Sequence, residues 1–231
     1  MKIIFTSDVV GHRDIKEFQP QPAKNYIPEW YKNMPSDVEY ETNYTKIPNF
    51  RTAKLCPNFL DIFTEGFVLP APCDIWLSVD GDGVNDWAWK TSNEAFDISI
   101  HGQGQLNNFL PNPVIKQIFK LNYPYRIIVP KGYSIRQLPL FYEYNPDWHV
   151  AYGVLKADVV NEVNLQICYT SEDKEVLIKA GEPLCYYVPF KREDYELVID
   201  NNYDKYKPQI EGSMHRALSK FKNGYRRFNK W

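Results

Sequence analysis

Hydrophobic and polar residues alternate in many short runs through the middle of the chain. These runs lie at residues 95–101, 125–130, 133–140, 149–157, 162–170, 175–180 and 183–189. Turn-forming residues separate them about every 8–12 residues, a spacing typical of antiparallel sandwiches and barrels. The sequence Asp-Gly-Asp-Gly at residues 80–83 lies between two further β-like runs and predicts a hairpin. The pattern predicts a mainly β fold over residues 67–190, in which another hairpin turns at Gly181 and only residues 113–119 suggest a short helix.

The pattern is helical or irregular at both ends of the chain. Residues 2–7 alternate like a short strand, and residues 36–50 are polar and contain a proline, as in a loop. Helical spacing of apolar residues occurs at 26–34, again at 52–66, where the helix is expected to end at Gly66, and once more after Pro208. We therefore predict an N-terminal strand and helical extension over residues 1–66, a β core over 67–190, and a C-terminal helix with a basic, aromatic tail over 191–231. The three regions are expected to form one compact domain.

The charge and composition of the chain limit the kinds of molecule that it is expected to bind. The formal net charge of −2 creates no overall field that would attract nucleic acid or an anionic membrane. No apolar run approaches the roughly 18–20 residues that span a bilayer. The apolar start is short and is interrupted by Asp8, which favours a first strand of a cytosolic protein over a signal peptide. The four cysteines are scattered without a Cys-x-x-Cys pair, so buried free thiols are expected.

Two histidines at predicted strand ends are the main candidates for chemistry. His101 and His149 could converge with Asp97 or Asp147, as two imidazoles and a carboxylate do in iron oxygenases. Neither His101 nor His149 begins a His-x-Asp or His-x-Glu, however, and hydrogen-bonded histidines at strand ends are the simpler interpretation. The Asp-Gly-Asp-Gly turn lacks a complete calcium loop, and no phosphate loop or Gly-x-Ser-x-Gly elbow is present. We therefore predict neither a metal nor a cofactor.

Aromatic residues make up 16% of the chain and predict contacts between molecules. Residues 140–153 carry six rings or imidazoles in fourteen residues, more than one small core readily buries. Tyrosine and tryptophan are favoured at protein contacts, so a homo-oligomer is expected. The basic, aromatic tail from residue 215 has the composition of a nucleic-acid contact. Docking of Phe228, Trp231 and the arginines at 226–227 on the protein or on a neighbouring subunit is favoured over that alternative.

Four stretches carry a resemblance to a known group of proteins. They are PAKNYIPEWYKNMP at 22–35, LPAPCDIWLS at 69–78, KGYSIRQLPLFYEYN at 131–145 and GEPLCYYVPFKRE at 181–193. These stretches resemble an uncharacterised protein family of large tailed marine phages, with more distant bacterial relatives. The resemblance implies a viral protein, located in the host cytoplasm or in the virion, and it implies no activity.

Residues 70–189 are also similar, more distantly, to the dUTPase-like barrel. Matches to that family's motifs occur in the same order, at 71–78, at 130–133 with Pro139, at 153–155 with Asp158 and Glu162, and at 178–184. The similarity implies a dUTPase-like β-barrel or sandwich with flanking helices, and a trimer if it holds. A double-stranded β-helix is the alternative fold.

The same similarity implies a degenerate active site. The family's water-activating Asp falls on Lys156, and its Arg-Ser phosphate pair falls on residues 140–141, which are Leu and Phe. A lysine in ordinary surroundings cannot act as that general base, because its pKa lies far above neutrality. The family's Gly-rich C-terminal lid is also missing from the sequence.

The candidate pocket drawn from these observations consists of His101, His149, Asp158 and Glu162. The leading hypothesis is a phage protein with a non-catalytic binding or assembly role. The alternative is an enzyme acting on a nucleotide or small metabolite, including a metal-dependent one.

Overall fold

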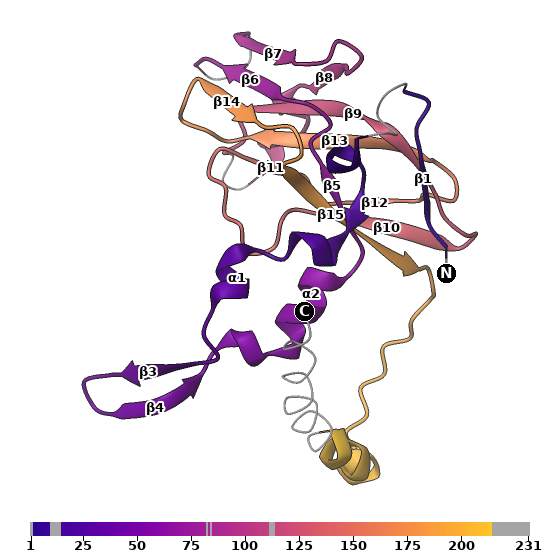
Figure 1. Ribbon diagram of the computed structural model, residues 1–231. Coiled ribbons are helices and arrows are strands. Elements are labelled where there is room, and N and C mark those ends of the chain that lie inside the picture. Colours follow the sequence, from indigo (N-terminus) through magenta and orange to yellow (C-terminus); the bar gives the residue numbers. More distant parts are fainter. Residues whose placement is uncertain (1, 10–14, 82, 84, 111–113, 214–231) are drawn as a thin grey trace. The chain divides into compact units, whose positions relative to one another are not determined.

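The computed structural model describes residues 2–9, 15–81, 83, 85–110 and 114–213 (Figure 1). The chain divides into two compact units. The first, which we call the β unit, consists of Met1–Tyr26 and Gly66–Arg192, and the second, the small unit, consists of Ile27–Glu65 and Glu193–Trp231. The tail residues 226–231, for which docking is expected, lie outside the described residues. The three predicted regions and their union in one compact domain stay predictions.

The described part of the β unit contains three antiparallel sheets. The first sheet has the order β1–β9–β13–β11, with β8 also paired to β9; its strands are β1 (Ile4–Thr6), β8 (Ile98–His101), β9 (Gln117–Ile128), β11 (Trp148–Val150) and β13 (Glu162–Tyr169). The second has the order β12–β10–β15–β5–β2, formed by β2 (Gln21–Pro22), β5 (Phe67–Pro70), β10 (Tyr133–Leu138), β12 (Gly153–Leu155) and β15 (Pro183–Lys191). The third has the order β14–β6–β7, formed by β6 (Ile75–Val79), β7 (Trp87–Thr91) and β14 (Glu175–Ile178). Short 3-10 helices lie at Lys16–Phe18, Ala23–Tyr26, Gln103–Gln105 and Asn107–Phe109.

Alternation along the long strand β9 places one of its faces in a core. Phe119, Leu121 and Ile127 are fully buried, and Leu121 lies opposite Leu165 of β13. One cluster of buried side chains draws residues from all three sheets. Burial of a leucine or isoleucine side chain contributes about 1.5–3 kcal/mol, so this shared core holds the sheets together. Within the described residues no sheet closes into a barrel, and the predicted mainly β class is confirmed as a sandwich of antiparallel sheets.

Two predictions about local structure in the β unit are wrong. Residues 117–119, expected to be helical, begin β9, because β8 and β13 pair with them on both sides. The predicted hairpin at Gly181 is also absent from the described strands, since β14 pairs with β6 in the third sheet whereas β15 pairs with β5 and β10 in the second. Gly181, with a φ of 80°, therefore turns a corner between two sheets.

The hairpin predicted at the Asp-Gly-Asp-Gly turn is confirmed. Strands β6 and β7 pair from Ile75–Thr91 to Val79–Trp87, and the amide of Asp80 donates to the carbonyl of Asp86 across the turn at 2.8 Å.

The small unit has an aromatic core. Its helices are α1 (Glu29–Asn33), the 3-10 turn Ala53–Leu55, α2 (Pro57–Thr64) and helical residues 203–213. Tyr31 and Phe63 are fully buried with ring centroids 5.0 Å apart, and Trp30 lies 5.8 Å from Phe63. The Lys54 ammonium donates to the carbonyls of Tyr31 and Lys32, both at 2.8 Å, and so satisfies the end of α1. Trp30 and Tyr31, which belong to the apolar residues at helical spacing over 26–34, thus serve as packing residues.

The segment expected to be a loop at residues 36–50 is instead a hairpin. It consists of β3 (Asp37–Glu41) and β4 (Lys46–Arg51), and every residue in both strands is exposed. Tyr40 and Phe50 stack at 5.0 Å on the hairpin. Cross-strand aromatic pairs of this kind stabilise a two-stranded sheet that has no core beneath it.

The helix predicted over residues 52–66 is a 3-10 turn at Ala53–Leu55 followed by α2, which ends at Thr64, two residues before Gly66. Gly66 has a φ of 75°, and a Cβ at this position would lie 2.3 Å from the carbonyl oxygen of Tyr187. Only glycine fits both requirements. No helix within the described residues is long and apolar enough to cross a membrane.

Candidate functional site

The two predicted histidines lie on one row of the first sheet. His101 of β8 is opposite Ile118 of β9, Ile118 is opposite Cys168 of β13, and Cys168 is opposite His149 of β11. Three strand spacings of about 4.8 Å separate the two histidines by roughly 14 Å. Ile118 and Cys168 fill that space as part of a small apolar cluster. The sheet therefore aligns the histidines and does not bring their imidazoles together.

Each histidine has its own surroundings. Nδ1 of His101 lies 3.2 Å from Oε1 of Gln105, as expected for a hydrogen-bonded residue at a strand end. His149 is half-buried, and burial lowers the pKa of its imidazole, which favours the neutral ring. Cys168 between them is buried, and burial raises the pKa of its thiol to about 11, so the thiol is protonated and unreactive.

Asp158 belongs to a different polar group, at the ends of β10 and β15. Its carboxylate receives two hydrogen bonds from the Arg192 guanidinium, at 2.8 and 2.5 Å, and one from the amide of Gly132 at 2.8 Å. These contacts, with the arginine first, hold the pKa of Asp158 below its ordinary value. Arg192 also donates to the hydroxyl of buried Ser134 at 2.8 Å. The arrangement ties three chain segments together and commits the carboxylate to structure.

Glu162 forms a third, separate group. It lies opposite Arg126 of β9 and accepts a hydrogen bond from its guanidinium at 2.9 Å. Both side chains are about half exposed, and such pairs contribute little to stability. The four predicted residues thus lie in three places: the histidines at the two ends of one row, Asp158 with Arg192, and Glu162 with Arg126.

A surface that the site prediction missed lies in residues 140–153, which we call the tyrosine segment. Tyr142, Tyr144 and Tyr152 are 45%, 88% and 74% exposed. Trp148, in the same segment, is buried in the main core. The sequence shows these residues as an aromatic run, but the alternation of apolar and polar residues does not indicate which of the rings face solvent.

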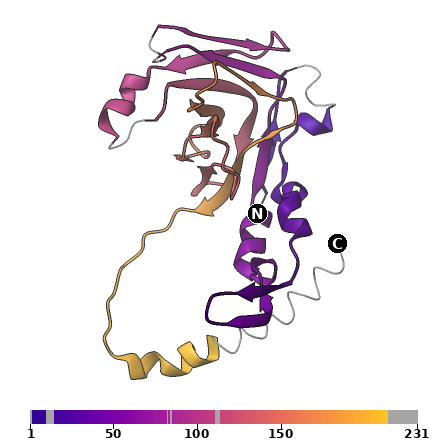
Figure 2. The same cartoon turned by 90° about the vertical axis from the view of Figure 1, so that its left-hand side faces the viewer.

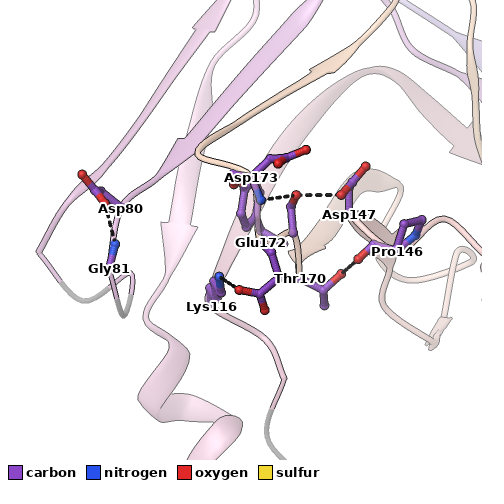
Figure 3. A network of polar contacts seen from close by, with 10 residues as sticks. Asp80, Gly81, Lys116, Pro146, Asp147, Thr170, Glu172 and Asp173 are labelled. Atoms are coloured by element: carbon purple, nitrogen blue, oxygen red, sulfur yellow. Dashed lines mark hydrogen bonds and ion pairs between the residues drawn. The ribbon is translucent and has the colours of Figure 1, made fainter.

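Hydrogen bonds to the end of β13 fix the second half of the tyrosine segment (Figure 3). The hydroxyl of Thr170 donates to the carbonyl of Pro146 at 2.7 Å, and the amides of Thr170 and Ser171 donate to the carbonyl of Asp147 at 2.8 and 3.0 Å. The Ser171 hydroxyl donates to the carboxylate of Asp147 at 2.6 Å and accepts from the amide of Asp173 at 3.0 Å. The backbone beside Tyr144 is therefore held in place.

Packing fixes the first half of the segment. The ring of Phe141 stacks on that of Tyr186 with centroids 4.5 Å apart, and Leu140 packs in the same cluster. Tyr142 follows with a φ of 58°, a left-handed conformation that costs a non-glycine residue roughly 1–2 kcal/mol. Such a conformation persists where the surrounding structure imposes it. Tyr152 lies between Ala151, whose amide donates to Gln166, and Gly153, which is opposite Gln137.

Two charged residues labelled in Figure 3, Lys116 and Asp80, each have a partner of opposite charge. Lys116 pairs with Glu172 at 3.1 Å. Asp80 accepts from the amide of Gly81 at 2.9 Å and pairs with Lys174 at 2.8 Å. The aspartate considered for a calcium turn is thus neutralised by a lysine.

The arrangement provides a fixed backbone that displays tyrosine rings and hydroxyls to solvent. A tyrosine offers a large apolar face and a hydrogen-bonding tip, which suits contact with another protein surface. Because the backbone is already ordered, binding there avoids much of the roughly 1–2 kcal/mol per residue that ordering a loop costs.

Comparison with known proteins adds a likeness of fold. No family model matches the chain, and no curated protein matches it. Among solved structures, the chain is similar to one titled "EIAV dUTPase native", with 12% identity and a TM-score of 0.33, over 59% of this chain and 84% of that one. At this TM-score the likeness supports no inference about activity, site residues or oligomeric state.

Proposed function

We propose that this is a phage protein with a binding or assembly role, acting as a homo-oligomer in the host cytoplasm or in the virion. The observation that carries the proposal is the tyrosine segment, which exposes Tyr142, Tyr144 and Tyr152 from a backbone fixed at both ends. Its phage origin rests on the sequence resemblance alone.

Exposed tyrosine rings gain free energy when contact with another molecule removes them from water. Residues that contribute most to protein interfaces are enriched in tyrosine and tryptophan and lie in areas that exclude water on association. Tyr144 and Tyr152 are mostly exposed in the single chain, so contact has much of their ring area left to bury.

Sedimentation velocity tests the proposal. We expect the wild-type chain to self-associate at micromolar concentration, and the double variant Y144S/Y152S to associate about 10- to 100-fold more weakly, as loss of two interface tyrosines implies. Y44S is the matched control, because Tyr44 is 97% exposed on the hairpin of the small unit. A variant that associates as well as the wild type would contradict the role of the segment.

The alternative function, an enzyme acting on a nucleotide or small metabolite, is tested by thermal shift. A ligand that binds only the folded state raises the melting temperature according to its concentration and affinity. Clear stabilisation by one nucleotide or by iron, with a monomeric wild-type chain, would favour the enzyme over the assembly role.

A further inference from the structure

An extended segment after β15 has the pattern of a strand and no strand partner among the described residues. We call residues 194–200 the arm; Figure 2 shows it within the thread that leaves β15. Tyr195, Leu197 and Ile199 alternate along it and are 83%, 89% and 82% exposed. Alternation of this kind is typical of a strand with one buried face. The exposure of these three large apolar side chains to water thus indicates that the arm packs on a surface of a partner.

The arm ends at a fixed point. The carboxylate of Asp200 accepts hydrogen bonds from the amide of Asn202 at 2.9 Å and from the hydroxyl of Tyr206 at 2.7 Å. Lys205 donates to the same carboxylate at 3.1 Å. These bonds attach the end of the arm to the start of helical residues 203–213, so the arm and these helical residues can move together.

An unoccupied edge lies at β12 of the second sheet. Among the described strands, β12 pairs only with β10, so its other side has no strand partner. Val154 on this edge is 61% exposed, and exposed Lys156 follows two residues later, on the same face by alternation. Leu155 lies on the opposite face and packs against the main core. An edge of this kind is a template for strand addition.

We propose that the arm of one copy adds as an antiparallel strand to the β12 edge of a second copy. This inference rests on the proposed assembly role and names the contact that joins two copies. In the proposed register, Glu196 lies opposite Lys156, Val198 opposite Val154, and Leu197 opposite Leu155. The arm carries Asp194, Glu196 and Asp200, whereas the edge carries Lys156 and neighbouring Arg136, which is opposite Val154 on β10.

Neighbouring registers fit less well. A shift by two residues in one direction moves Glu196 away from Lys156 and places it beside Asp158, whose carboxylate already pairs with Arg192. A shift by two in the other direction places Ile199 opposite Ala151. The amide of Ala151 donates to the carbonyl of Gln166 in β13, so the chain has already left the β12 edge at this residue. A shift by one moves all three large apolar side chains to the face of Lys156.

The chain is too short to make this pairing with its own β12 edge. Lys191 at the end of β15 is opposite Tyr133 of β10, and β12 lies on the far side of β10. The added strand would be three spacings from β15, roughly 14 Å away. In this pairing Tyr195 would lie beside Ala157. The four residue steps from Lys191 to Tyr195 span at most about 14 Å. They reach that distance only along a straight line, which would pass through β10 and β12 themselves. A second copy meets no such restriction.

Disulfide trapping between separately tagged chains tests the register. Residues directly opposite in a sheet have Cβ atoms about 4.5–5.5 Å apart, close enough for a disulfide after slight movement, whereas diagonal neighbours are about 7–8 Å apart. Chains carrying V154C and V198C, both in a C56S background, are mixed at micromolar concentration and oxidised. We expect a covalent dimer that contains both tags, and little product when K156C replaces V154C.

The outcomes separate the inference from the proposed function. An oligomer that forms without the V154C–V198C product overturns the arm contact and leaves assembly through the tyrosine segment standing. A monomeric wild-type chain overturns both. A chain that carries both V154C and V198C gives a further control. A disulfide within that single chain would overturn the contact between copies, because it would show that the arm pairs with the β12 edge of its own chain.

A substitution on the arm gives a second measurement. L197D places a charge on the face proposed to meet Leu155, and we expect self-association to weaken about 10- to 100-fold, as loss of one buried leucine implies. L177D is the matched control, since Leu177 is 43% exposed on the edge strand β14. Equal effects of the two substitutions would overturn the proposal.

Discussion

Removal of one hydroxyl, in the variant S171A, is expected to loosen the tyrosine segment. Ser171 is 1% exposed; its hydroxyl donates to the carboxylate of Asp147 at 2.6 Å and accepts from the amide of Asp173 at 3.0 Å. A hydrogen bond to a charged group contributes about 1.5–3 kcal/mol, and one between neutral groups about 0.5–1.5 kcal/mol. Asp147 is partly exposed and Asp173 is exposed, so water replaces part of both bonds. We expect a net loss of about 2 kcal/mol in the free energy of unfolding.

Urea denaturation and hydrogen exchange together measure this effect. A loss of about 2 kcal/mol lowers the urea midpoint by roughly 1 M for a protein whose slope is about 2 kcal/mol/M. Amides near Tyr144 should exchange faster in S171A, because the segment loses an anchor while the sheets remain. S99A is the matched control, since Ser99 is exposed on β8. A midpoint equal to that of S99A, or a lower midpoint without faster exchange near Tyr144, would refute the anchoring role.

Three further predictions concern titratable groups. Because Arg192 and Gly132 hold the pKa of Asp158 below its ordinary value, D158N should be less stable than the wild type at pH 7, and guanidinium unfolding should show the difference shrinking as pH falls below about 4, through the folded pKa. Because burial lowers the pKa of His149, the unfolded chain binds its proton more tightly; the wild type should lose stability below about pH 6.5, and thermal melts of H149Q should show a smaller loss. A thiol reagent should label partly exposed Cys56 in the folded protein and reach the three buried cysteines only after unfolding; rapid reaction of all four would contradict their burial.

Much of the β unit was predictable because most of its longer strands bury at least one face. Strands β10 and β13 lie within predicted runs, and β15 extends two residues beyond its run at 183–189, since the apolar residues of a buried face leave a direct trace in the sequence. Strand β9 was mispredicted at its start, where polar and apolar residues give no clear period. Pro124 also lies inside β9, and the pairing of β9 with β13 shifts register between Glu162 and Asn164 near this position. A proline in a central strand is tolerated at such irregularities, which a sequence alone does not reveal.

The candidate residues were harder to predict than the strands, because a site depends on register between distant segments. Nothing in the sequence around His101 and His149 shows that two strands lie between them. The partner of Asp158 is 34 residues away, at Arg192, and the distance along the chain hides the pair. The aromatic run at 140–153 was visible, but which of its rings face solvent depends on the stack of Phe141 on Tyr186.

Hydrogen exchange at two protein concentrations tests the central claim most directly, because it reports contact at the tyrosine segment itself. The wild-type chain is compared at nanomolar and at tens of micromolar concentration, with Y144S/Y152S as the reference. We predict that amides within residues 142–152 become protected as concentration rises, and that the double variant shows no such change. An oligomer that leaves these amides unprotected, or a chain that stays monomeric at both concentrations, would contradict the account.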